Sequence, residues 1–381
     1  MSTPSSGSSG ASPVHSNWSA DVLGPPWQAS TIALRPDGAG APVATLVRRR
    51  AVRSAAGPSA PAVLYLHGFA DYFFQADHGR AWAERGFDFY ALDMRDHGRS
   101  IRPGRRPGWV PGIETHVEEV SAALHIIRTD GDAPAGDGRL DGEGSPGSSE
   151  VADGDAPADH ETPGSPAEPT GGPAGRPVLL MGHSTGGLIA CLYADRHPRA
   201  VAGLVLNSPW FDLHRPKPVR TLARPLIRTL GNVAPLLPVS ALDDGYGRSL
   251  HSSTGGDFDY RLDWKPLDAF PIRAGWLASV LDAQRRVRRG LDILAPVLMC
   301  TSDASGHPTR PTAAQLAGTD VVLGVADMHR AAPRLGADVQ VLQVSGGRHD
   351  LALSDEPARN FYTENILDWA EQKAAPSTRL R

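Results

Sequence analysis

The chain of 381 residues has little cysteine, few aromatic residues and no long apolar run. Its two cysteines, Cys191 and Cys300, are too few for a disulfide scaffold or a cysteine-rich zinc module. No apolar stretch approaches the roughly 18 residues that a membrane span requires. Residues 1–16 have neither the cationic start nor the apolar segment of a secretory signal. We therefore expect a cytoplasmic protein without stable membrane insertion.

An excess of basic residues is also missing. The chain has 38 Lys and Arg against 42 Asp and Glu, which gives a formal net charge of -4. This balance argues against a nucleic-acid binder, because such proteins depend on a basic field. The acidic residues gather at 130–175, where aromatic residues are absent and Leu140 and Val151 are the only large aliphatic residues. Such a stretch buries too little apolar surface to offset its ordering entropy, and we predict a disordered acidic insertion, with an acidic docking segment as the alternative.

Elsewhere, short apolar runs alternate with segments of helical periodicity. Strands are expected at 30–34, 43–49, 63–66, 87–92, 177–181, 201–206, 297–300 and 339–344. Helices are expected between them, among them 75–85, 188–197, 325–335 and 356–373. This alternation predicts an α/β fold with a mainly parallel central sheet flanked by helices, and an antiparallel pair at one edge.

Residues 210–290 interrupt the alternation, because one crossover helix would be enough between the strands on either side. We predict that they form a cap over the edge of the sheet where open α/β sheets bind ligands. The chain then divides into an α/β core and four other parts. The predicted core comprises 17–129, 176–209 and 291–375, the insertion is 130–175, the cap is 210–290, and the tails are 1–16 and 376–381.

The sharpest local pattern is Gly182-His183-Ser184-Thr185-Gly186. It follows a buried strand directly and opens a helix, which is the setting of a nucleophile elbow with Ser184 as the nucleophile. The alternative is a phosphate-binding or plain tight turn. It is less favoured because the glycine patterns of the P-loop and of dinucleotide-binding turns are absent.

A serine nucleophile needs a base and a group that orients the base. His349 follows the last expected strand, at the sheet edge where Ser184 also emerges. Two aspartates compete for the third position. Asp320 precedes His349 by one helix and one strand and is favoured, whereas Asp303 implies an additional loop and stays as the alternative.

The negative oxygen of a tetrahedral intermediate requires backbone N–H donors. Thr185, the residue after the nucleophile, supplies one. Phe69 supplies the other, because it follows an early strand in the sequence His67-Gly68-Phe69. We expect His67 to brace this loop rather than act as a base.

Several motifs occur in the order of a known family. They are His67-Gly68-Phe69, the loop 93–100, Gly182–Gly187, Asp320-Val321-Val322 and the loop 346–350. In these motifs the chain resembles an α/β-hydrolase of the monoacylglycerol lipase and lysophospholipase type, which is also grouped with serine aminopeptidases.

The resemblance implies a carboxylic-ester hydrolase with an acyl-enzyme intermediate, in which Ser184, His349 and Asp320 form the triad. Neither a metal nor an organic cofactor is implied, and the expected partner is a small-molecule ester with an apolar acyl or aromatic group. A peptidase or amidase with the same triad is an alternative. A non-catalytic binding protein on the same fold is a second alternative.

Overall fold

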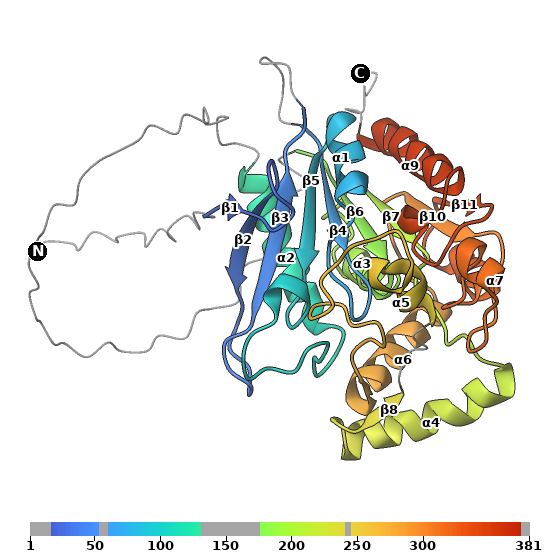
Figure 1. Ribbon diagram of the computed structural model, residues 1–381. Helices are drawn as coiled ribbons and strands as arrows, with labels where there is room; N and C mark the ends of the chain where they lie inside the picture. The colour runs from blue at the N-terminus through green and yellow to red at the C-terminus, as the bar shows by residue number, and fades with distance from the viewer. Residues whose placement is uncertain (1–16, 53–59, 131–175, 241–244, 375–381) are drawn as a thin grey trace, which may run out of the picture.

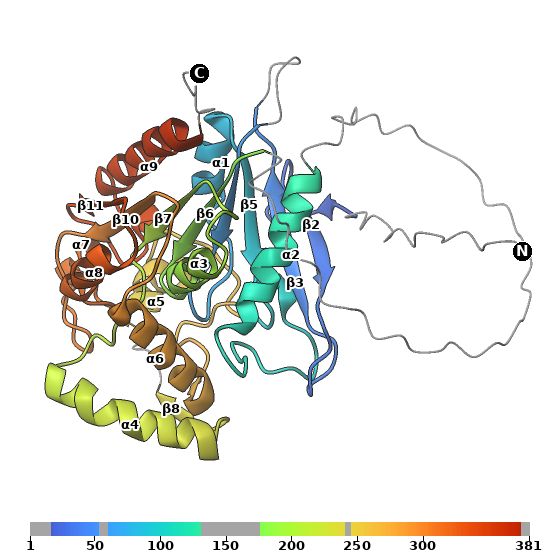
Figure 2. The same cartoon turned by 180° about the vertical axis from the view of Figure 1, so that it is seen from behind.

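The computed structural model describes residues 17–52, 60–130, 176–240 and 245–374. They form a nine-stranded sheet with helices on both faces (Figures 1 and 2), which confirms the predicted α/β-hydrolase fold class. The strands are β1 (Ser19–Ala20), β2 (Gln28–Ala33), β3 (Val43–Arg49), β4 (Ala62–Leu66), β5 (Asp88–Asp93), β6 (Val178–His183), β7 (Gly203–Asn207), β10 (Val297–Ser302) and β11 (Val339–Val344).

The strand order is β1-β2-β3-β5-β4-β6-β7-β10-β11. Pairing is antiparallel from β1 to β5 and parallel from β5 to β11. Every residue of β4, β5, β6, β7 and β10 is buried, as expected for parallel strands covered on both faces. The carboxyl ends of these parallel strands meet at one edge of the sheet.

The sheet separates two large apolar clusters, one on each of its faces, and helices cover both. One face packs against α1 (Ala76–Glu84) and α9 (Ala358–Ala374), and the other against α2 (Thr115–Asp130), α3 (Thr185–Arg196) and α8 (Val325–Ala331). Alternation along β4 shows the division: Leu64 and Leu66 belong to the α2 and α3 side, and Val63 and Tyr65 to the α1 and α9 side. Figure 2 shows α2 and α3 in front of the sheet.

One predicted helix is shorter than expected. The segment 325–335 is helical only to Ala331 and continues as a 3-10 turn, Ala332–Arg334. Pro333 accounts for the difference, because it has no N–H to donate and its ring crowds the preceding turn of an α-helix.

The predicted cap segment contains α4 (Lys217–Val233), β8 (Pro238–Ser240), α5 (Gly245–Leu250), β9 (Ile272–Arg273) and α6 (Ala274–Arg289). Helix α6 is amphipathic and buries Trp276, Leu277 and Val280 against the core. Helix α4 packs on α6, and every α4 residue retains some exposure. Figure 1 shows α4 and α6 together below the sheet. A short helix, α7 (Ala313–Gly318), follows β10.

Residues 131–175, which make up almost all of the predicted insertion, lie outside the described residues, as do both predicted tails, 1–16 and 376–381. The described residues on either side of the insertion meet at Tyr90. The Tyr90 hydroxyl donates to Asp130 Oδ2 at 2.6 Å and lies 2.8 Å from an Arg176 guanidinium nitrogen that donates to it. Among the described residues, no helix is both long and apolar enough to cross a bilayer.

Deleting Asp132–Gly172 is expected to leave the fold and its activity nearly unchanged, because Asp130 and Arg176, which flank the segment, bond to one phenol oxygen and a short linker can join them. The expected change in melting temperature is less than about 4 °C, which corresponds to roughly 1 kcal/mol for a core of this size. Thermal unfolding and ester hydrolysis, measured beside the full chain, test this. A much larger loss of melting temperature would contradict an inert insertion.

Candidate active site

Ser184 lies at the sharp turn between β6 and α3. Its backbone has φ 53° and ψ -115°, a conformation that a residue with a side chain rarely adopts. The turn requires glycine on both sides. A Cβ at Gly182 would lie 2.4 Å from the Gly186 carbonyl oxygen, and a Cβ at Gly186 would lie 2.3 Å from the Leu66 carbonyl oxygen. The predicted nucleophile therefore stands at the first turn of a helix, at the carboxyl end of a buried strand.

His349 and Asp320 are in direct contact, although 29 residues separate them. His349 Nδ1 lies 3.0 Å from Asp320 Oδ2, and both side chains are buried. The other carboxylate oxygen accepts backbone N–H groups from Val322 at 2.9 Å and Leu323 at 2.7 Å. These bonds fix the orientation of the carboxylate. When His349 Nδ1 donates to it, Nε2 is left free to accept a proton.

Asp303, the alternative acid, has a different environment. Its carboxylate is exposed and accepts hydrogen bonds from the Ser345 hydroxyl at 2.8 Å and the Gly346 N–H at 3.3 Å. It thus holds the turn after β11. The structure brings Asp320 to His349 and keeps Asp303 on that turn.

The two predicted oxyanion donors lie beside the nucleophile. A Cβ at Gly68 would lie 3.3 Å from Ser184 Cβ, so the loop that carries Phe69 runs directly along Ser184. Thr185 is the first residue of α3, where the N–H has no partner within the helix. In the described part of the chain, neither the Phe69 nor the Thr185 N–H donates to another group. Both are available to an incoming oxygen.

His67 braces the loop, as expected. Its Nε2 accepts the Met94 N–H at 3.0 Å and its Nδ1 lies 2.7 Å from the Gly68 carbonyl oxygen, so Nδ1 is the protonated nitrogen. Burial lowers the pKa of His67 and keeps the ring neutral.

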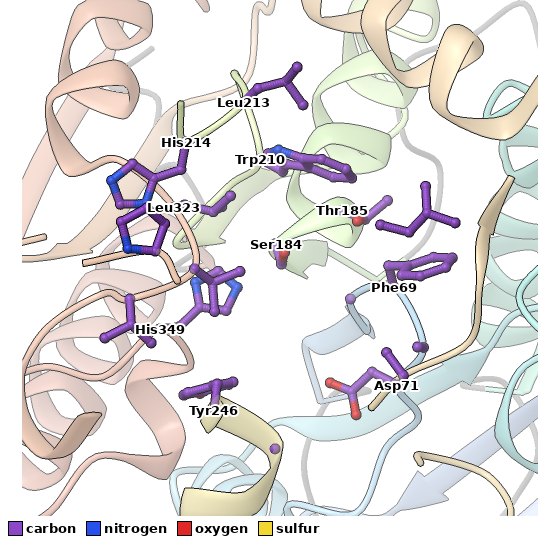
Figure 3. A pocket seen from close by; sticks show the side chains of 18 of the residues that line it. Phe69, Asp71, Ser184, Thr185, Trp210, Leu213, His214, Tyr246, Leu323 and His349 are labelled. Carbon is purple, nitrogen blue, oxygen red and sulfur yellow. The ribbon is translucent and has the colours of Figure 1, made fainter. Parts of the chain in front are cut away.

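Ser184, His349, Phe69 and Thr185 line one pocket of about 370 Å³. Figure 3 shows the His349 ring pointing toward Ser184, with Asp71 across the pocket. Much of the wall is apolar and comes from the cap and from the loop after Asp320. These apolar residues include Leu213, Val219, Ala223, Ile227, Val239, Leu277 and Val322.

One charged pair in the pocket wall was not predicted. Lys265 Nζ, from the cap segment, lies 2.6 Å from Asp71 Oδ1, and both side chains are largely buried. The ammonium group also lies over the rings of Phe74 and Tyr260. Nothing local in the sequence marks this pair, because its members are 194 residues apart.

A second unpredicted feature is a buried polar network behind the triad. Asp350, directly after His349, accepts hydrogen bonds from Asn207 Nδ2 at 2.7 Å and Gln75 Nε2 at 2.9 Å. Burial alone would raise the pKa of Asp350, but His183 and these two donors hold it below its usual value. A polar Asn207 at the end of the apolar run Gly203–Leu206 is the one sequence signal that could have pointed to the network.

Within the residues that the structure describes, no group of three or more His, Cys, Asp or Glu side chains is arranged to hold a metal ion.

A family model described as serine aminopeptidase, S33, matches residues 57–134 and 169–357. A monoacylglycerol lipase from Mycolicibacterium smegmatis is 26% identical over 309 residues, which cover 81% of this chain and 86% of that protein. The sequence match to the family model pauses at 135–168, within the predicted insertion.

Two solved structures share the fold. The monoacylglycerol lipase of Paleococcus ferrophilus has a TM-score of 0.56 at 18% identity, covering 86% of this chain and 98% of that one. A soluble variant of monoglyceride lipase from Saccharomyces cerevisiae has a TM-score of 0.57 at 14% identity, covering 90% and 94%. Together with the family match, they confirm the predicted resemblance to α/β-hydrolases of the monoacylglycerol lipase type.

Replacing the acid tests the site directly. Asp320→Asn should lower kcat/KM by about 10⁴-fold, because an amide in this position favours the wrong imidazole tautomer and does not stabilise the imidazolium. Asp303→Asn is the matched control, since it makes the same change on the exposed turn, and it should leave kcat/KM nearly unchanged. Steady-state hydrolysis of a p-nitrophenyl ester measures both, and the opposite ranking would assign the acid to Asp303.

Proposed function

Because the chain belongs to the serine aminopeptidase, S33, family, we propose that it cleaves small-molecule carboxylic esters with Ser184, His349 and Asp320 as its triad. The observation that carries the proposal is the 3.0 Å contact between His349 and Asp320 in the pocket that also holds the strained Ser184. The family and the Mycolicibacterium smegmatis relative confirm the predicted enzyme class, a carboxylic-ester hydrolase.

In the proposed mechanism, Ser184 Oγ attacks the ester carbonyl carbon while His349 Nε2 takes the hydroxyl proton. Asp320 holds the ring and stabilises its charged form. The Phe69 and Thr185 N–H groups donate to the oxyanion, and one such donor is typically worth about 10²–10³ in rate. His349 then protonates the departing alcohol. Water, deprotonated by His349, attacks the acyl-enzyme, which releases the acid and restores Ser184.

The pocket supports an apolar acyl or aromatic group as the recognised part of the substrate. Val219, Ala223 and Ile227 recur every four residues on α4 and line the pocket, so one face of this helix forms an apolar wall. The carboxylate of Asp71 and the ammonium of Lys265 form a polar patch in the same pocket. An acyl chain along α4 and a hydroxyl-bearing alcohol at the polar patch fit a monoacylglycerol or a similar ester, in line with the names of the relatives.

The family description favours a second candidate, an aminopeptidase on the same triad. Such an enzyme needs an acceptor for the charged amino terminus of its substrate. Asp71 is the one carboxylate among the described residues that line the pocket, and Lys265 already neutralises it at 2.6 Å. A free ammonium group would be repelled by Lys265. The pocket therefore favours esters over amino-terminal peptides.

A fluorophosphonate probe tests the nucleophile. The wild-type chain should be labelled and Ser184→Ala should not, because the probe reacts only with an activated serine hydroxyl. Intact mass measurement and peptide mapping identify the modified residue. Equal labelling of both proteins would refute Ser184 as the nucleophile, and a folded wild-type chain that is neither labelled nor active on esters would favour the non-catalytic binding protein.

A bulky side chain on the apolar wall of α4 tests whether the acyl chain binds there. Ala223→Trp should lower kcat/KM for p-nitrophenyl decanoate by about tenfold or more, because the ring takes space that the chain would occupy, while the acetate ester is little affected. Leu222→Trp is the matched control. Leu222 is next to Ala223 on α4, but its side chain is 76% exposed and does not line the pocket. An equal loss on both esters would place the acyl chain elsewhere.

A pair of chromogenic substrates separates the two hydrolase candidates. p-Nitrophenyl butyrate should be hydrolysed and alanine p-nitroanilide left intact, because the pocket offers no unpaired carboxylate to the amino group. Efficient release of p-nitroaniline, lost in Ser184→Ala, would instead support the aminopeptidase.

A further inference from the structure

We propose that Asn207 is a positioning residue that fixes the histidine loop, 346–350, relative to the nucleophile elbow. The inference rests on the proposed function, since it concerns how Ser184 and His349 are held at a fixed position relative to each other. These two residues follow strands that are not neighbours in the sheet. Ser184 follows β6 and His349 follows β11, and in the sheet β7 and β10 lie between them. Asn207 is the last residue of β7.

The backbone of Asn207 holds the elbow. Its carbonyl oxygen accepts the Ser184 N–H at 2.9 Å and lies 3.2 Å from His183 Nδ1. Register agrees with this contact, because His183 at the end of β6 pairs with Asn207. The strained backbone of Ser184 is thus bonded directly to the end of the neighbouring strand.

The side chain of the same residue holds the histidine loop. Asn207 Nδ2 donates to Asp350 Oδ1 at 2.7 Å, and Asn207 Oδ1 accepts the Leu351 N–H at 3.2 Å. The partners fix the orientation of the amide, because a carboxylate only accepts and a backbone N–H only donates. Both partners follow His349 directly in the chain. One fully buried residue therefore carries bonds to both loops.

Asp350 is held from other sides as well. Gln75 Nε2 donates to its second carboxylate oxygen at 2.9 Å, the Ala352 N–H donates to its first at 3.1 Å, and its own N–H donates to the Tyr246 hydroxyl at 2.9 Å. A buried carboxylate is costly unless hydrogen bonds compensate it. The loop therefore has a strong preference for the position in which Asp350 meets Asn207.

The geometry predicts a kinetic effect. Without the Asn207 amide, Asp350 loses its shortest donor, and His349 is no longer tied to the elbow through β7. A misplacement of about 1 Å between reacting groups can cost roughly 10²-fold in rate. Asn207→Ala should therefore lower kcat by about 10- to 10²-fold. KM should change little, because Asn207 does not line the pocket.

Thr301→Val is the matched control. Thr301 is also fully buried, near the carboxyl end of β10, and its hydroxyl lies 3.0 Å from His329 Nε2 on α8. Its replacement removes a buried polar contact that joins neither catalytic loop. We expect a lower melting temperature with kcat and KM close to those of the wild-type chain.

A second variant separates positioning from stability. Asn207→Ala leaves the buried Asp350 carboxylate short of a donor, and this loss is expected to lower the melting temperature. Adding Asp350→Asn removes the uncompensated charge. The double variant should regain melting temperature over Asn207→Ala and still show the low kcat, because the link between the loops remains absent. If kcat recovers together with melting temperature, Asn207 serves stability alone and the proposal fails.

The assay compares these variants with the wild-type chain and Ser184→Ala on one p-nitrophenyl ester, and adds the second-order rate of fluorophosphonate labelling. An inactive wild-type chain, or an active Ser184→Ala, would overturn the proposed function. An active wild-type chain, an inactive Ser184→Ala and a folded Asn207→Ala with unchanged kcat would overturn the positioning role alone.

Discussion

The site depends on one backbone constraint, the conformation of Ser184 between β6 and α3. A residue with φ 53° and ψ -115° costs of order 1–3 kcal/mol and persists only where its surroundings fix it. Here the surroundings are a fully buried strand before it, a largely buried helix after it and the hydrogen bond from its N–H to Asn207. The close approach of Gly182 to Gly186 completes the turn. The same constraint presents the hydroxyl and the Thr185 N–H to one pocket.

Residues 261–265 of the predicted cap are joined to the loop that carries Phe69, the proposed oxyanion donor. Lys265 binds Asp71, which is two residues after Phe69, and the Arg261 N–H donates to the Tyr72 hydroxyl at 2.9 Å. Trp264 packs edge-on against Tyr72. A shift of this part of the cap would be transmitted to the loop that carries the Phe69 N–H. Residues 261–265 and the loop that carries the Phe69 N–H are therefore held together by a shared set of contacts.

The sequence alone predicts the parts of the site that are set by residues close together in the chain. The elbow is a strand, a glycine-flanked serine and a helix in succession, and His349 follows a strand that apolar residues define. The choice between Asp320 and Asp303 was different, because both follow β10 and only the path of the chain decides which carboxylate reaches His349. Asn207 and the pair of Asp71 and Lys265 were missed for the same reason, since their partners are more than 100 residues away in the chain.

Buried carboxylates lie at both ends of the parallel strands, and the two groups have different roles. At the amino end of β5, Asp88 binds Arg50 and Arg176, next to the point where Asp130 and Arg176 meet Tyr90. Asp130 and Arg176, which flank residues 131–175, are thus held at the end of the sheet away from the pocket. At the carboxyl end, Asp320 and Asp350 are buried within two separate sets of donors. Burying two carboxylates beside His349 is a poor way to gain stability. It is a good way to hold an imidazole in one place and one tautomer, which is what the proposed attack by Ser184 requires.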